Sequence, residues 1–380
     1  MRVAVNLPNM GSPASEAPRE AVKKISGGAR GNEAMKSPTS ENVLKALADY
    51  LAEDMLACNR EIIARMQSDV PLIPQLAAHL VAAGGKRLRP LLVLAAARLA
   101  GYREQGEGMR HIGVAACVEF IHTATLLHDD VVDNSQLRRG LASANAVFGN
   151  KASVLVGDFL FARAFQILTA GGSLPVMAIL SAASATLAEG EVMQMTTQND
   201  LTTTVDRYLQ VIYGKTAALF AAACETGAVV AGTDEQTREA LRQYGANLGM
   251  AFQLVDDALD YSADQAVLGK TVGDDFYEGK VTLPVLAAYH AGNKEDQEFW
   301  RRTIEDSDDG QQDGDLEHAL ELIARTNAIN VTMDKDRNYA QAASDALDRM
   351  SKAGLAANAD MEPLRQLLKD VAIYTVDRAR

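Results

Sequence analysis

Two clusters of aspartate with the same spacing are the residues of this chain best suited to chemistry. The pattern DDxxD occurs in HDDVVD and again 127 residues later in VDDALD, which gives the acids Asp129, Asp130, Asp133, Asp256, Asp257 and Asp260. In a helix, the first and last acids of each motif lie on one face, one turn apart. Acids at this spacing are usually only solvated. Their repetition after two apolar segments indicates a shared role instead, because a buried carboxylate requires a cation or hydrogen bonds.

Carboxylate oxygens are the ligands that Mg²⁺ prefers, and the ion commonly takes one or two of them together with water and substrate phosphate. Two DDxxD faces across a cavity would therefore suit a group of ions that bridges a diphosphate. Without cations, each unit-charge pair at 4 Å would be repelled by about 4 kcal/mol at an effective dielectric constant of 20. Divalent ions reverse that sign and also activate diphosphate as a leaving group.

Length and composition restrict the class of protein. The 380 residues are 48% hydrophobic but only 5% aromatic, which favours closely packed helices. A formal net charge of −13 excludes nucleic acid as the main partner. The three cysteines (Cys58, Cys117 and Cys224) are far apart in the sequence and predict neither disulfides nor a zinc site, as in a cytoplasmic protein. No apolar run is long enough to predict a membrane span.

The order of apolar and breaker residues predicts an all-α chain. Residues 1–40 are rich in Gly, Ser and Pro and are expected to form a mobile tail. Residues 41–380 read as one helical domain, with a long helix over 205–232 and the second aspartate helix over 235–262. The acidic segment 305–317 does not have the spacing of a calcium-binding loop.

Five ordered motifs resemble those of the trans-isoprenyl diphosphate synthases, most of all the long-chain octaprenyl and decaprenyl types. They are GGKRLRP, EFIHTATLLHDDVVDNSQLRRG, YGKTAALF, FQLVDDALDY and GKTVGDDFYEGKVTLP, and the resemblance covers about residues 45–380. It implies the isoprenoid synthase fold, in which long antiparallel helices surround a central cavity, and a homodimer. It also implies that isopentenyl diphosphate is condensed onto an allylic diphosphate.

The resemblance assigns roles to individual residues. All six aspartates would hold Mg²⁺, three ions in each site, with Mn²⁺ as an alternative. The isopentenyl diphosphate would be bound by Lys86, Arg89, His122 and Arg139. The allylic diphosphate would be bound by Arg138, Lys215, Thr216 and Gln253, and two lysines, Lys270 and Lys280, would reach the diphosphates.

Neighbouring polar residues are expected to do less. Arg87 lies between two of these ligands and is predicted to form a structural ion pair. Asp274 and Asp275 have no third acid four residues on, so we expect them to cap a loop or support the second motif. Glu189, Glu191 and Gln194 resemble a segment of the family, but their residue types do not by themselves require a direct role.

Small residues below the first motif predict a long product. The positions on the same helix that would border the growing tail are Ala124, Thr125, Ile121 and Cys117. Short-chain relatives carry bulky aromatic residues next to the motif, so small side chains here leave a tunnel open, which also runs along SAASATLA. We expect a farnesyl or geranylgeranyl primer, an octaprenyl to decaprenyl product and use of that product as a quinone side chain.

Two alternatives stay open at this level. A terpene cyclase would share the fold but would have no use for GGKRLRP, His122 and the adjacent arginines. A non-catalytic subunit of a heteromeric synthase is the other, although this chain has retained all six aspartates.

Overall fold

The computed structural model describes residues 40–82, 84–103, 110–138, 140–262, 272–306, 310–351 and 359–377. The chain divides into two compact units, residues 1–37 and 38–380, and every described residue belongs to the second. The predicted tail, residues 1–40, therefore lies outside the described residues except for Ser40.

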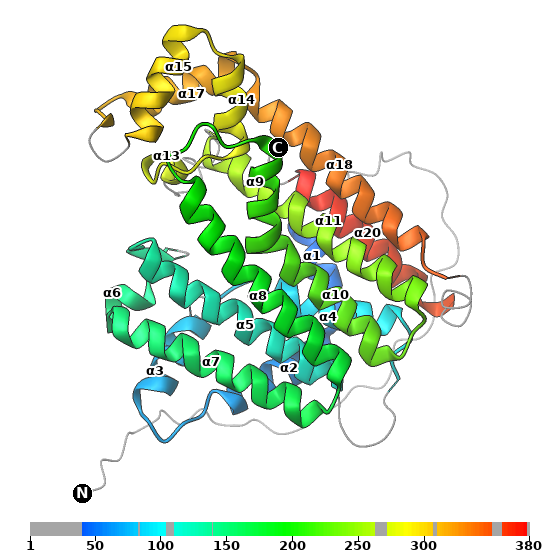
Figure 1. Cartoon of the computed structure of the whole chain (residues 1–380). Coiled ribbons are helices and arrows are strands. Elements are labelled where there is room, and N and C mark those ends of the chain that lie inside the picture. Colours follow the sequence, from blue (N-terminus) through cyan, green and yellow to red (C-terminus); the bar gives the residue numbers. More distant parts are fainter. Residues whose placement is uncertain are drawn as a thin grey trace, which may run out of the picture. The chain divides into compact units, whose positions relative to one another are not determined.

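The described part of the chain is helical apart from one short hairpin (Figure 1). The α-helices are α1 (Ser40–Tyr50), α2 (Ala52–Arg65), α3 (Leu72–Ala82), α4 (Leu88–Leu99), α5 (Arg110–Val132), α6 (Ala144–Phe148), α7 (Asn150–Gly171), α8 (Leu174–Thr197), α9 (Val205–Ile212), α10 (Ala218–Ala231), α11 (Glu235–Asp260), α13 (Asp274–Tyr277), α14 (Leu283–Ala291), α15 (Lys294–Trp300), α17 (Asp315–Arg325), α18 (Ala328–Asp348) and α20 (Glu362–Asp377). Two π-helical turns, η1 (Tyr213–Ala217) and η2 (Arg301–Glu305), and a 3₁₀ turn, η3 (Ala359–Met361), complete the helical elements. The hairpin pairs β1 (Leu137–Arg138) with β2 (Leu141–Ala142) antiparallel.

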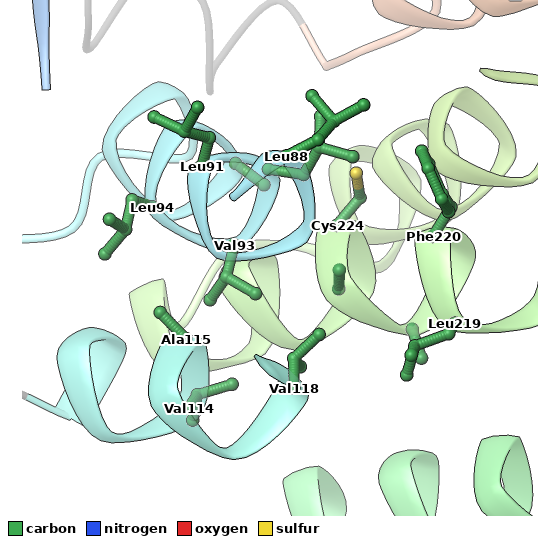
Figure 2. Close-up of a cluster of buried hydrophobic side chains, with 14 of the residues drawn as sticks. Leu88, Leu91, Val93, Leu94, Val114, Ala115, Val118, Leu219, Phe220 and Cys224 are labelled. Carbon is green, nitrogen blue, oxygen red and sulfur yellow. The ribbon is translucent and has the colours of Figure 1, made fainter. Parts of the chain in front are cut away.

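Helix α4 lies in the core and packs against α5 and α10. Its sequence LRPLLVLAAARL is apolar on every side, as expected of a helix with no solvent face, and ten of its twelve residues are buried. Figure 2 shows side chains of α4, α5 and α10 meeting in this core, among them Leu91, Val118 and Phe220. The core therefore fixes the direction of α5, which carries the first aspartate motif.

Helix α11 connects two parts of the fold. It packs against α10 on one side and α18 on the other, and α20 lies alongside α18 (Figure 1). A second hydrophobic cluster forms around its carboxyl-terminal end from α9, α14, α15 and α17, with Trp300 fully buried. That cluster holds the end of α11, where the second aspartate motif lies.

Helices α7 and α8 are apolar but only partly covered. Both are long and apolar enough to cross a membrane by length and composition alone, which the sequence analysis did not expect. Only 33% and 28% of their most apolar windows are buried. Leu155, Phe165, Leu174 and Met195 are at least half exposed. Large apolar side chains exposed in this number on two helices often mark a surface that a partner covers.

Candidate functional site

The two aspartate motifs lie where α5 and α11 end. The Asp133 N–H donates to the carbonyl of Asp129 at 2.8 Å and closes the last turn of α5. After α11, the backbone N–H of Asp275 donates to Oδ2 of Asp260 at 3.0 Å, so the loop that follows is fastened to the motif. Asp275 thus contacts the second motif through its backbone, whereas its carboxylate raises the pKa of Asp260. The predicted supporting role of the side chain stays a prediction.

One ammonium group interacts electrostatically with both motifs. Lys280 pairs with Glu278, and its Nζ lies 3.5 Å from Oδ1 of Asp275. Burial opposes the charge of Lys280, but Asp275, Glu278 and, from the first motif, Asp133 raise its pKa above the usual range. The same lysine lowers the pKa of Asp260 in the second motif. One cation therefore interacts electrostatically with acids of both motifs.

A cavity of about 560 Å³, open to solvent, lies beside the second motif. Its lining comes from α8, α9, η1, α11 and the segment 275–282, and includes Gln194, Lys215, Gln253, Asp257 and Lys280. Lys215, which lines this cavity, also lowers the pKa of Asp129 in the first motif.

Lys215 is positioned by a π-helical turn. The sequence predicted one unbroken helix over 205–232, but η1 separates α9 from α10, and such single wide turns often occur at functional sites. The turn touches α8 through glycines: a Cβ atom added to Gly190 would lie 2.6 Å from the backbone nitrogen of Lys215. This close approach brings Nζ of Lys215 to 3.1 Å from Oε2 of Glu191 on α8.

The middle aspartate of the second motif is engaged by the protein. Asp257 is 4% exposed, and its two oxygens accept hydrogen bonds from Tyr208 Oη at 2.5 Å and Gln253 Nε2 at 2.7 Å. Thr216 in turn donates to Oε1 of Gln253 at 2.8 Å. These bonds connect α9, η1 and α11, so Asp257 fixes the turn that carries Lys215.

The middle aspartate of the first motif is held in a similar way. Asp130 is 1% exposed, and its Oδ1 accepts a hydrogen bond from Nε of Arg138 at 2.7 Å. Its backbone carbonyl accepts a further hydrogen bond from Nδ2 of Asn145 at 3.0 Å. Arg138 lies in β1, so the hairpin after α5 is tied to the motif.

Several motif acids hold their protons unusually strongly. Burial, followed by the charge of Glu191, raises the pKa of Asp129 to about 7. Burial and Asp275 raise the pKa of Asp257 to about 8 and that of Asp260 to about 7. The pKa values of these carboxyl groups are raised because burial and neighbouring negative charges oppose their ionisation. A cation bound next to them would relieve that repulsion, so the site favours cations.

The predicted isopentenyl diphosphate residues also come together. Nη1 of Arg89 lies 3.0 Å from Nε2 of His122, and its guanidinium stacks 4.7 Å from the ring centre of Phe220. Because a guanidinium can only donate, Nε2 is the acceptor and the imidazole is neutral with its proton on Nδ1. Nζ of Lys86 lies 3.1 Å from Oη of Tyr374 on α20.

The intervening arginine behaves as its sequence context predicted. Arg87 has a left-handed backbone conformation (φ 48°) just before α4, which turns its side chain away from its neighbours. Its Nη1 lies 2.6 Å from Oε1 of Glu119 on α5, in a structural ion pair.

Below the first motif, a smaller cavity of about 190 Å³ lies between α5, α7 and α8. Its lining includes Ile121, Phe161, Leu168, Ser181 and Ser184, so the segment SAASATLA does border it as predicted. We call it the inner cavity.

The other three predicted tunnel residues do not line the inner cavity. Thr125 is half-buried one turn below Asp129, and its hydroxyl donates to the carbonyl of His122. Ala124 is fully buried, and the thiol of Cys117 points to the carbonyl of Ala164 on α7 at 3.7 Å.

Two predicted ligands, Arg139 and Lys270, lie outside the described residues. Sequence reasoning missed Tyr208, Glu278 and Tyr374, and gave Glu191 little weight. One feature of the sequence could have identified Tyr208 as a neighbour of the site: it precedes Lys215 by seven residues, which in a regular helix places the two side chains on one face. Among the described residues, no three acidic, histidine or cysteine side chains are grouped closely enough to hold a metal ion by themselves.

Comparison with known proteins yields consistent matches. The family model described as polyprenyl synthetase matches residues 70–323. Octaprenyl diphosphate synthase of Escherichia coli is 44% identical over 337 residues, which cover 89% of this chain and 99% of the relative.

Solved structures match as well. The decaprenyl diphosphate synthase of Rhodobacter capsulatus superposes with a TM-score of 0.82 at 51% identity, covering 89% of this chain and 99% of that one. The polyprenyl synthase of Caulobacter crescentus, in complex with calcium and isoprenyl diphosphate, gives a TM-score of 0.80 at 48% identity, covering 89% and 98%.

Proposed function

The chain belongs to the polyprenyl synthetase family and is a prenyltransferase, and from that premise we propose that it is a long-chain trans-polyprenyl diphosphate synthase. It would extend a farnesyl or geranylgeranyl primer with isopentenyl diphosphate to an octaprenyl to decaprenyl product, used as a quinone side chain. The observation that carries the proposal is that acids of both aspartate motifs interact with Lys280, which lines a cavity beside the second motif. The relatives that support the chain length are octaprenyl and decaprenyl diphosphate synthases.

The donor atoms of the site fit divalent cations with a preference for oxygen. The outer acids Asp129, Asp133, Asp256 and Asp260 would hold Mg²⁺, three ions in each site, and Mn²⁺ would be accepted as well. Because no three of the described ligand-type side chains suffice alone, phosphate oxygens and water would complete each ion's coordination. When bound, the ions would stabilise the charge of the diphosphate as it leaves.

The residues of the chain do the remaining work at the allylic side. Lys215 and Lys280 are positioned to neutralise the departing diphosphate, and Arg138 can exchange Asp130 for a phosphate oxygen. The hydroxyl of Thr216 and the amide of Gln253 present dipoles that stabilise an allylic cation without reacting with it.

The isopentenyl diphosphate does not ionise, so it is held by cations directly. Lys86 and Arg89 would bind its phosphates, with His122 fixing the orientation of Arg89. After its double bond has attacked the allylic carbon, one proton must be lost, and we propose that the released diphosphate accepts it.

We further propose a homodimer whose subunits meet through α7 and α8. The support is the apolar surface of these helices, which includes Leu155 and Phe165 at 67% and 50% exposure. A cytoplasmic location is supported by the three free cysteines, all of which are buried.

Chromatography of the products formed by the purified chain from farnesyl diphosphate, labelled isopentenyl diphosphate and Mg²⁺ tests the proposal. We expect a ladder ending at eight to ten isoprene units. Cyclic hydrocarbon without incorporated label would instead identify a terpene cyclase, and the absence of turnover would identify a non-catalytic subunit. The comparisons support neither alternative.

A further inference from the structure

Lys280 ends a short segment, residues 273–280, that we call the lysine segment. A single turn of helix, α13, forms its middle, and one turn of helix is not stable in water by itself. Contacts with other elements must therefore fix the place from which Lys280 reaches the cavity beside the second motif. The structure shows three such attachments.

The first attachment is to the end of α11. The N–H groups of Gly273 and Asp275 donate to Asp260, one to its backbone carbonyl at 2.9 Å and the other to its Oδ2 at 3.0 Å. The N–H of Lys280 in turn donates to the carbonyl of Asp275 at 2.9 Å. Hydrogen bonds thus link the backbone of Lys280 to the second aspartate motif.

The second attachment is to the end of α8. Nε2 of Gln198 donates to the carbonyl of Glu278 at 2.6 Å, and the N–H of Asn199 donates to the carbonyl of Gly279 at 3.0 Å. Both acceptors lie within two residues of Lys280. The end of α8 therefore holds the part of the lysine segment that carries the ammonium group.

The third attachment comes from the acidic segment 305–317, which the sequence analysis left without a role. Nε2 of Gln311 donates to two carbonyls at 2.9 Å, that of Phe276 in the lysine segment and one in η2. The backbone on both sides of Gln311 is fixed as well, because both Nη atoms of Arg302 lie 2.7 Å from the carboxylate of Asp315. The amide of Gln311 thus joins the lysine segment to a rigid part of the fold.

We propose that Gln198 and Gln311 are positioning residues that hold Lys280 where it receives the diphosphate. Their two side-chain amides come from different elements and donate to carbonyls of the same segment. A glutamine amide is neutral, so it fixes the backbone without adding charge to a site that already contains several acids. A lysine is a point charge on a flexible stem, so the affinity that it contributes depends on where its backbone is held. This inference rests on the role of Lys280 in the proposed function.

Binding of inorganic diphosphate in the presence of Mg²⁺, measured by calorimetry on the full chain, tests the proposal without turnover. Gln311→Met keeps the length of the side chain but cannot donate, and it should weaken binding about three- to tenfold. The control Gln312→Met changes the exposed neighbour and should bind as the wild type does. Lys280→Gln removes the charge and should weaken binding about 10- to 100-fold.

Combining the variants separates positioning from a general loss of structure. If Gln311 acts through Lys280, Gln311→Met should have no further effect in the Lys280→Gln chain, whereas a purely structural role would weaken binding equally in both chains. Gln198→Met should behave in the same way. Because Gln198 is exposed, this variant decides the question even if Gln311→Met folds poorly.

Wild-type binding by both glutamine variants, with binding by Lys280→Gln weakened, would overturn the proposal and leave the role of Lys280 intact. Equal weakening with and without Lys280 would also overturn it, since the glutamines would then act on the fold in general. Wild-type binding by Lys280→Gln would overturn the positioning role together with the role of Lys280 in the proposed function.

Discussion

Replacing Thr125 by phenylalanine should shorten the product to about two or three isoprene units. Thr125 lies four residues before Asp129 on the same face of α5, which is about 6 Å, or little more than one isoprene unit. Its hydroxyl donates to the carbonyl of His122 in the same helix, so the substitution removes no side-chain hydrogen bond between Thr125 and another element of the described part of the chain. A phenyl ring there would stand between the metal-binding acids and Ile121, where the inner cavity begins.

The assay is chromatography of labelled products formed from geranyl and farnesyl diphosphates. Geranyl diphosphate should remain a good primer for Thr125→Phe, and farnesyl diphosphate should become a poor one because its tail meets the ring. Thr125→Val, which removes only the hydroxyl, should retain the long product. Ala124→Phe is a less informative variant, because Ala124 is fully buried and overpacking typically costs about 1 to 3 kcal/mol of stability. If Thr125→Phe accepted farnesyl diphosphate with an unchanged KM and made the full product, the assigned path would be wrong.

Three further predictions concern the charged groups. Lys215→Gln should weaken binding of the allylic diphosphate about 10- to 100-fold, since hydrogen bonds to charged groups contribute about 1.5 to 3 kcal/mol. The KM for isopentenyl diphosphate should change little. Arg89→Gln should show the reverse pattern, and equal effects of either variant on both substrates would contradict the assignment. Tyr208→Phe should raise the allylic KM, because the bond that holds Asp257 is lost, whereas a variant with wild-type kinetics would show that this bond positions nothing. In the metal-free chain, the pKa of Asp129 rises from 3.8 to about 7, so the folded state binds protons that the unfolded state releases. That contribution to stability is complete below pH 4 and is lost as the pH rises through about 7. The Tm without metal should therefore fall between pH 5.5 and 8.5, and Mg²⁺ should raise the Tm more at pH 8.5 than at pH 5.5. A metal-free Tm that is independent of pH in this window would contradict the shift in the pKa of Asp129.

Much of the fold follows from the sequence because helix periodicity and end signals are local. The all-helical architecture and the ion pair of Arg87 were both predicted. The π-helical turn at Lys215 was not, because YGKTA has the composition of an ordinary helix. The turn lies where Gly214 closely approaches Gly190, a residue 24 positions earlier in the sequence, and such a contact cannot be recognised from the local sequence.

The site was predicted less completely than the fold, because spacing identifies which residues can face one way but not which partner each will choose. Asp130 and Asp257 occupy equivalent places in the two motifs, and both are engaged inside the protein. Neither Arg138 nor Tyr208 could be identified as those partners from the motif alone, since one comes from a hairpin and the other from a different helix.

Electrostatics gives a reason why the middle aspartate of each motif is hydrogen-bonded within the protein. Six carboxylates facing one cavity would repel one another by about 4 kcal/mol per pair at 4 Å and a dielectric constant near 20, before any cation arrives. Hydrogen bonds within the protein satisfy the carboxylates of Asp130 and Asp257, while Lys215 interacts with Asp129 and Lys280 interacts with Asp133. The pKa values of Asp129 and Asp260, each raised to about 7, show that the remaining repulsion and burial are only partly compensated. A site left in that condition binds divalent ions and diphosphate together more readily than either alone, because each removes the charge that opposes the other.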